Sequence, residues 1–200
     1  MNELRYVLAL ANLMFVPGSI LFWFSLHPFV QFWRRVGAKA ALALHYLLIA
    51  LLAALVYWQR RRLLAVEFGT NWYLAAIGVA LLFAGAILKK QFGVHLRFRI
   101  LTGLPELDPE RYQSRLLTEG IYSRIRHPRY VQYVIVVLGY ALISNYLAVY
   151  LLTALLIPAL ALVIRWEERE LRQRFGKQYE DYCARVPRFI PRLHWRKRPH

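Results

Sequence analysis

The chain has 200 residues, of which 58% are hydrophobic, and a formal net charge of +16. Its apolar residues come in long uncharged runs, which excludes an ordinary soluble domain. The single cysteine, Cys183, excludes an internal disulfide and a thiolate metal cluster, and nothing in the sequence indicates a zinc or iron site.

Five apolar runs predict five membrane-spanning helices, since a span needs about 20 apolar residues. The first run is longer than the apolar core of a signal peptide, and no cleavage site follows it, so we expect a span there too. The fourth run is short, and only Ser144 and Asn145 separate it from the fifth, which predicts a tight helical hairpin. The five runs are Tyr6–Leu26, Ala38–Trp58, Asn71–Leu88, Pro128–Ile143 and Tyr146–Ile164.

Basic residues are distributed unevenly around these runs. With a cytoplasmic C-terminus, three lie in the first inner loop, nine between Lys89 and Arg129 and eleven from Arg165 onward, which makes 23, against four outside. The positive-inside rule therefore predicts an outer N-terminus and a cytoplasmic C-terminus. This placement indicates contact with anionic lipid and no nucleic acid partner. A short chain without a targeting signal suits a prokaryotic inner membrane.

The polar residues form two blocks on the predicted cytoplasmic side, residues 89–127 and 165–200. We therefore divide the chain into an N-terminal three-helix membrane region, residues 1–88, and a second region, residues 89–200, that holds the hairpin and both blocks. The first block opens with VHLRFRI, which is compatible with a strand or an interfacial segment, and continues with the loop TGLPELDPER. The second block predicts a helix that leaves the membrane and is interrupted at Gly176.

The stretch SRIRHPRY places basic and aromatic residues at the foot of the fourth span. Pro128 suits the first position of a helix, so His127 directly precedes a helix N-terminus, where free N–H groups favour an anion. Arg124 and Arg129 are expected to anchor this helix at lipid phosphates. The candidate site residues of this stretch are Tyr122, Arg126, His127, Pro128 and Tyr130.

Three glutamates at the inner end of the fifth span differ in their local partners. Glu168 and Glu170 each have an arginine four residues on, in the favourable acid-first order, so we expect them to be solvated charges on the helix face. Glu167 has no such partner, and the hairpin returns it to the membrane face of His127. An unpaired carboxylate near an arginine-rich helix start is a candidate site residue.

Both polar blocks carry a resemblance to a known family. LLTEGIYSRIRHPRY resembles the L-(V)-T-x-G-x-Y-x-x-x-R-H-P-x-Y signature of the isoprenylcysteine carboxyl methyltransferase family, and phospholipid N-methyltransferases share a related pattern. EERELRQRFGKQYEDYCARVPRFIP is similar to the E-E-x-x-L…F-G-x-x-Y-x-x-Y…V-P tail of the same family. The resemblance covers residues 114–191 of the chain.

The resemblance implies an all-α integral membrane methyltransferase that binds S-adenosyl-L-methionine in a cytoplasmic pocket. Its partners would be the lipid bilayer and a lipophilic small molecule or lipidated substrate, such as a prenylcysteine carboxylate. Arg165 is the nearest basic residue to the family's substrate-side arginine. Matching positions assign cofactor binding to Leu116, Leu117, Tyr122, His127, Pro128 and Tyr130, with Glu167 near the sulfonium or amino group of the cofactor. The expected catalytic residues are Glu167, Arg126 and Arg165, the last without a matched register.

Other functions remain open at this point. A membrane reductase of the sterol-reductase type would use NADPH, and a non-enzymatic membrane protein would use the arginines only to bind lipid. The acceptor is also open, because Tyr133 lies close to a position where relatives carry a small residue, and this would reshape the acceptor pocket. Methyl transfer requires that donor and acceptor are positioned in line and that water is excluded. It needs no nucleophilic side chain, which agrees with the lack of a convincing catalytic triad in the sequence.

Overall fold

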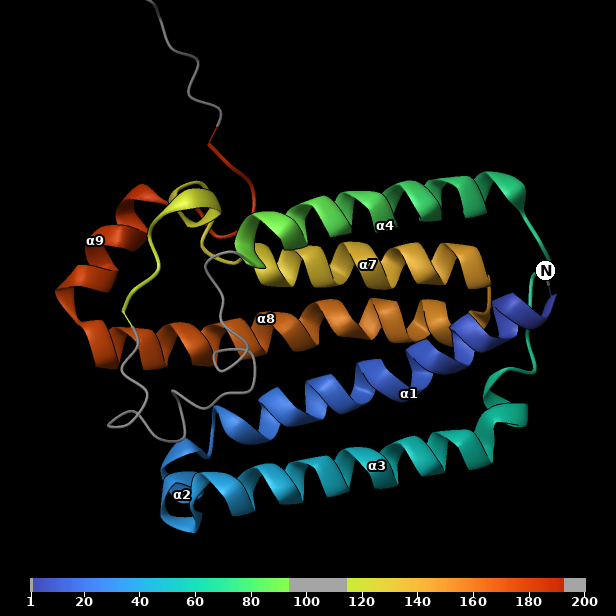
Figure 1. Ribbon diagram of the computed structural model, residues 1–200, viewed down its shortest axis with the longest axis horizontal. Helices are drawn as coiled ribbons and strands as arrows, with labels where there is room; N and C mark the ends of the chain where they lie inside the picture. Colours follow the sequence, from blue (N-terminus) through green and yellow to red (C-terminus); the bar gives the residue numbers. More distant parts are fainter. Residues whose placement is uncertain (1, 94–114, 193–200) are drawn as a thin grey trace, which may run out of the picture.

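The computed structural model describes residues 2–93 and 115–192 (Figure 1). Within these ranges the chain is helical, apart from loops and one isolated bridge between Glu67 and Tyr146, which confirms the predicted all-α class. The segment VHLRFRI and the loop TGLPELDPER lie outside the described residues. The helices are α1 (Asn2–Leu26), α2 (Val30–Val36), α3 (Ala38–Leu63), α4 (Trp72–Gly93), the 3-10 helix η1 (Gly120–Ser123), α7 (Pro128–Ser144), α8 (Leu147–Phe175) and α9 (Lys177–Arg185).

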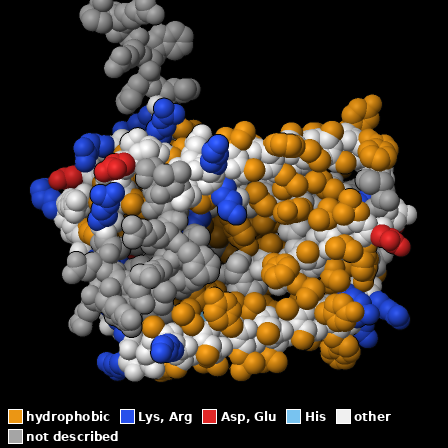
Figure 2. Space-filling model, viewed as in Figure 1, with side chains coloured by type: hydrophobic (Ala, Val, Ile, Leu, Met, Phe, Trp, Pro, Cys, Tyr) orange, Lys and Arg blue, Asp and Glu red, His pale blue; other side chains and the backbone are white. Residues whose placement is uncertain are grey.

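Four of the described helices, α1, α3, α4 and α8, are long and apolar enough to cross a membrane. The shorter α7 has 17 residues, which span about 26 Å as an α-helix. These five helices run alongside one another in Figure 1, and they correspond to the five predicted spans. Figure 2 shows apolar side chains over much of this helical face, whereas Lys and Arg side chains gather toward its two ends.

The helices α7 and α8 form the predicted hairpin. α7 ends at Ser144, Asn145 adopts a left-handed conformation with φ of 59°, and α8 begins at Leu147. At this turn the buried Arg5 donates from Nε to the Ser144 carbonyl oxygen at 2.9 Å and lies 3.8 Å from the Glu67 carboxylate. Arg5 therefore ties the start of α1 to the turn of the hairpin.

The helix α7 packs against α4 on one side and against α1 and α8 on the other. Against α4 the two backbones approach closely, and a Cβ atom added to Gly139 would lie 2.9 Å from the Gly78 carbonyl oxygen. Small residues permit this approach, and van der Waals packing then holds the helices together within lipid. On the other side, Val137 of α7 belongs to a buried cluster with Val16 of α1 and Leu156 of α8.

The helix α8 has 29 residues, which is longer than a span requires, so its last turns carry polar side chains beyond the apolar bundle. It ends at Gly176, where φ is 51°, and α9 follows and packs back against α8. The predicted interruption at Gly176 is therefore confirmed. The division of the chain between residues 88 and 89 stays a prediction.

Candidate functional site

One end of the bundle brings together segments that are far apart in the sequence (Figure 1). The end of α1, the start of α7 and the polar turns of α8 all lie at this end, and α9 lies there as well. Glu167 and Glu168 project from α8 about 100° apart, because an α-helix turns once in 3.6 residues. They therefore contact different groups.

Glu168 is the centre of a buried ion-pair group, which we call the Glu168 cluster. Its carboxylate accepts hydrogen bonds from Arg126 at 3.0 Å and from Arg188 at 2.6 Å, and it lies 3.5 Å from Arg172. Nε2 of His127 lies 3.1 Å from the same carboxylate. The Glu168 side chain is 1% exposed, so the prediction that it is a solvated charge is wrong. Its expected partner Arg172 is present, but three further partners come from other segments.

Arg126 also holds the segment that follows α9. Its Nη1 donates to the carbonyl oxygens of Cys183 and Val186, at 2.9 and 3.0 Å, near the C-terminal end of α9. Such carbonyls have no partner within their own helix, and a guanidinium group satisfies them well. The backbone N–H groups of Arg126 and His127 donate to two further carbonyl oxygens of the same segment, at 2.9 and 3.0 Å. These contacts fix the C-terminal segment against the start of α7.

Tyr122, in η1, is buried beside the same end of α7. Tyr182 of α9 donates its hydroxyl to the Tyr122 carbonyl oxygen at 2.7 Å, and the Tyr122 ring packs in a cluster with Phe92 and Leu117. Burial raises the pKa of the Tyr122 phenol well above its ordinary value, so this hydroxyl keeps its proton at neutral pH. The side chain of Leu116 packs in a separate cluster that includes Tyr182. The side chains of Leu116 and Leu117 are thus used in packing, which leaves their backbone for a ligand.

Glu167 lies on the other side of α8 from the Glu168 cluster. Its Oε2 atom is buried and has no hydrogen-bond partner among the residues that the structure describes. This carboxylate interacts with the Arg129 guanidinium, with the imidazoles of His127 and His27, and with the Tyr130 hydroxyl. Glu167 therefore matches its expected position, without a partner on its own helix and facing the start of α7.

Arg129 borders this carboxylate at the start of α7. Its guanidinium lies over the rings of Trp23 and Tyr130, at 4.6 and 4.9 Å, and its Nη2 donates to the Tyr130 hydroxyl at 3.0 Å. The prediction that Arg129 anchors the helix at lipid phosphates is therefore wrong, whereas Arg124 is exposed as expected. Trp23 belongs to α1, so this contact joins the first span to the site.

His27, directly after α1, is a residue of this region that sequence reasoning missed. Its Nδ1 lies 3.2 Å from the Glu170 carboxylate, and its ring stacks on Trp23 with centroids 5.1 Å apart. Its Nε2 is buried and has no hydrogen-bond partner within the described part of the chain. Glu170 is thus not a solvated charge. The available signal was the pair His27-Pro28, which repeats the His127-Pro128 pair of the predicted site.

Of the other predicted residues, Pro128 is buried at the first position of α7 and Tyr130 is buried two residues later. Arg165 is exposed on α8, and the structure gives it no contact with Glu167. A cavity of about 150 Å³ lies beside Arg129, between α1, α7 and α8. An apolar groove of about 330 Å³ lies on the opposite face of the hairpin, beside Phe189.

Comparison with known proteins gives this geometry a chemical context. The model of a family described as phospholipid methyltransferase matches residues 73–178, which is more than half of the chain. The chain belongs to this family. Together with its apolar helices, this membership makes it an integral membrane methyltransferase. The reductase and the non-enzymatic alternatives are not favoured.

Individual relatives agree with this assignment. A protein of Oryza sativa subsp. indica, described as a probable protein-S-isoprenylcysteine O-methyltransferase, is 28% identical over 159 residues, covering 79% of this chain and 82% of the relative. Protein-S-isoprenylcysteine O-methyltransferase B of Arabidopsis thaliana is 30% identical over 122 residues, covering 60% and 61%. Methanethiol S-methyltransferase 2 of Bradyrhizobium diazoefficiens is 29% identical over 182 residues, covering 85% and 67%. No solved structure is significantly similar to the chain.

Proposed function

We propose that the chain transfers the methyl group of S-adenosyl-L-methionine to a lipophilic acceptor that reaches the site from the bilayer. The names of its relatives give two kinds of acceptor, protein isoprenylcysteine and methanethiol, and both are candidates for this chain. We further propose a cytoplasmic site, with the N-terminus outside, in a prokaryotic inner membrane. The distribution of basic residues supports this orientation.

The observation that carries the proposal is the buried Oε2 atom of Glu167, which lacks a hydrogen-bond partner among the described residues. A buried carboxylate is costly unless a cation or a donor satisfies it. S-adenosyl-L-methionine supplies a methyl group on a positively charged sulfur, and it also carries an amino group. Glu167 would hold this positive charge, while Tyr122, which keeps its proton, would offer a neutral hydrogen-bond donor.

The remaining residues of the predicted site would complete the cofactor pocket. Pro128 leaves the first turn of α7 with free N–H groups, and these favour a carboxylate. Tyr130 would contribute an aromatic wall, and the backbone around Leu116 and Leu117 would contribute hydrogen-bonding groups. His127 and Arg126 would act mainly as positioning residues, because the Glu168 cluster holds both of them. Positioning of this kind is the principal requirement of an in-line displacement.

The proposal is tested by calorimetric titration of the purified protein with S-adenosyl-L-methionine and, separately, with NADPH. We expect binding of the first ligand only. Glu167→Gln should weaken it about ten- to a hundredfold, because a hydrogen bond to a charged group contributes about 1.5–3 kcal/mol. Glu180→Gln, at an exposed position of α9, is the matched control and should bind like the parent.

The alternatives give different results in the same titrations. Binding of NADPH alone would favour a reductase, and binding of neither ligand would favour a lipid-binding protein. If S-adenosyl-L-methionine binds but Glu167→Gln equals the parent, then Glu167 is not part of the cofactor pocket.

A further inference from the structure

The cavity of about 150 Å³ is lined by three helices that belong to both halves of the sequence. α1 contributes Ser19 and Trp23, α7 contributes Arg129 and Tyr133, and α8 contributes Leu160. The rest of the lining is Ile20, Tyr130, Gln132 and Val163. The cavity is therefore mostly apolar, with one cationic group, the Gln132 amide and, besides the Tyr130 hydroxyl bound by Arg129, the two hydroxyl groups of Ser19 and Tyr133.

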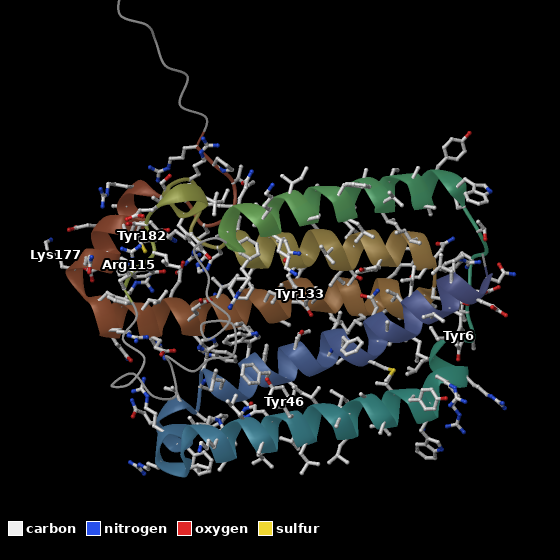
Figure 3. All side chains as sticks on the ribbon, in the orientation of Figure 1. Tyr6, Tyr46, Arg115, Tyr133, Lys177 and Tyr182 are labelled. Carbon is white, nitrogen blue, oxygen red and sulfur yellow. The ribbon has the colours of Figure 1, made fainter. Side chains whose placement is uncertain are left out.

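These residues lie at two depths along the bundle. Trp23 and Arg129 are within one turn of the end of α1 and the start of α7, at the end of the bundle that holds the site. Ser19 and Tyr133 each lie four residues further along the same helices, which places them about 6 Å deeper toward the middle of the bundle. Figure 3 labels Tyr133 well inside the helical bundle, between Tyr182 at the site end and Tyr6 at the other. The cationic group is thus at the entrance, and the two hydroxyl groups are at the inner end.

At that inner end, the hydroxyl groups of Ser19 and Tyr133 are hydrogen-bonded to each other. This contact joins α1 to α7 across the cavity, and Ser19 also donates to the Val16 carbonyl oxygen at 2.8 Å. The phenol ring of Tyr133 is held in place by this bond. We propose that the Ser19–Tyr133 pair closes the acceptor cavity and restricts this enzyme to short apolar acceptors that end in a thiol or a carboxylate. The inference rests on the proposed methyltransferase function and specifies its acceptor.

The volume of the cavity sets the size of the acceptor. An engineered apolar cavity of about 150 Å³ in another protein holds benzene or xenon. Pockets for drug-sized ligands are larger, at about 300–1,000 Å³. The part of an acceptor that lies inside this cavity is therefore limited to a short alkyl or aryl group, and a prenyl chain would have to extend out of it.

The charge at the entrance sets the chemistry of the acceptor. Arg129 is framed by Trp23 and Tyr130 and presents its guanidinium in the cavity lining. A guanidinium stabilises an anionic nucleophile, either a carboxylate or the thiolate form of a thiol. The groove on the opposite face of the hairpin is larger, about 330 Å³, but its described lining contains no charged side chain. An anionic nucleophile is therefore favoured in the smaller cavity.

The test compares acceptors of increasing length at a fixed concentration of methyl-labelled S-adenosyl-L-methionine. The short thiols are ethanethiol and hexanethiol, the long acceptor is N-acetyl-S-farnesylcysteine, which would accept the methyl group on its carboxylate, and hexanoate is the short carboxylate that separates the effect of length from that of the nucleophile. In the parent, kcat/KM for the farnesyl compound should be at least about tenfold below that for ethanethiol, because a filled apolar pocket rejects excess hydrocarbon strongly. Tyr133→Ala should raise about tenfold the ratio of kcat/KM for the farnesyl compound to kcat/KM for ethanethiol. Tyr133→Phe, which keeps the ring, should leave this ratio low.

Calorimetric binding of the same acceptors in nanodiscs gives a readout that does not depend on turnover. Tyr140→Ala is the matched control, because Tyr140 is on the same helix but lines neither the cavity nor the groove. It should leave the ratio of the two kcat/KM values unchanged. The inference is overturned if the parent uses the farnesyl compound as well as ethanethiol, or if Tyr133→Ala does not change the ratio. If the parent methylates none of these acceptors, the proposed function is contradicted. The dependence of the calorimetric affinity on acceptor length then tests the size limit by itself.

Discussion

At the residue scale, Glu168 is held by arginine side chains, so its substitution should lower the thermal stability of the protein. Glu168→Gln would leave the buried Arg126 and His127 without their counter-charge. Breaking a buried ion pair costs about 3–5 kcal/mol, and the lower end applies here because Arg172 and Arg188 are half exposed. We expect the midpoint of thermal unfolding to fall by roughly 6–12 °C. Thermal denaturation followed by intrinsic fluorescence measures this shift.

Glu167→Gln is the matched comparison, because it makes the same chemical change one residue away. It removes a carboxylate whose Oε2 atom has no hydrogen-bond partner in the described part of the structure but which still faces Arg129, so the unfolding midpoint should fall clearly less than in Glu168→Gln. Similar losses of thermal stability in the two variants would contradict the assignment of Glu168 to structure and Glu167 to the ligand.

The sequence could predict that Glu167 lacks a partner on its own helix, but it could not predict the burial of Glu168. Spacing along a helix reveals partners three or four residues away, such as Arg172. The other partners of Glu168 are Arg126 and His127, 42 and 41 residues earlier, and Arg188, 20 residues later. Their approach depends on the hairpin and on the return of the C-terminal segment. No local pattern encodes that return.

At the element scale, the contact between α4 and α7 depends on the close approach of two glycines. Gly139→Ala would place a Cβ atom 2.9 Å from the Gly78 carbonyl oxygen, which is backbone and cannot rotate away. Overpacking costs about 1–3 kcal/mol, and the higher helix propensity of alanine offsets about 1 kcal/mol of this. We expect a net loss of up to about 2 kcal/mol in the free energy of unfolding, measured by titration with a denaturing detergent.

Gly93→Ala is the control for this substitution, because a Cβ atom on Gly93, at the end of α4, would meet nothing within 4 Å. Its stability should equal that of the parent or exceed it slightly. A loss at Gly93 as large as that at Gly139 would show that glycine flexibility, and not close packing, is what the helices require.

The helices and the hairpin were predictable because they depend on the length of apolar runs and on the turn at Ser144 and Asn145. The rotation of each helix about its axis was not, because a helix that is apolar on all sides gives no amphipathic signal. The position of Arg129 illustrates this limit. Its basic charge suggested lipid phosphates, whereas the packing of α7 turns it toward Trp23 of α1.

At the scale of the whole molecule, charged side chains gather at the two ends of an apolar bundle (Figure 2). One end holds the site, together with α9 and the start of α7, and the other end holds the basic run Arg60–Arg62 and the Arg5–Glu67 pair. The basic residues of the whole sequence are far more numerous on the site side. By the positive-inside rule, this distribution supports the proposed orientation, with the site toward the cytoplasm.

Cysteine labelling tests this orientation, in a Cys183→Ser background that removes the native thiol. Arg115 and Lys177 are exposed at the site end, where Figure 3 labels both, and Arg62 is exposed near the other end of the bundle. In intact cells, a membrane-impermeant maleimide should modify Arg62→Cys, whereas Arg115→Cys and Lys177→Cys should react only after the membrane is opened. The reverse pattern would place the cofactor pocket outside the cell, away from the cytoplasmic supply of S-adenosyl-L-methionine, and would contradict the proposed function together with the orientation.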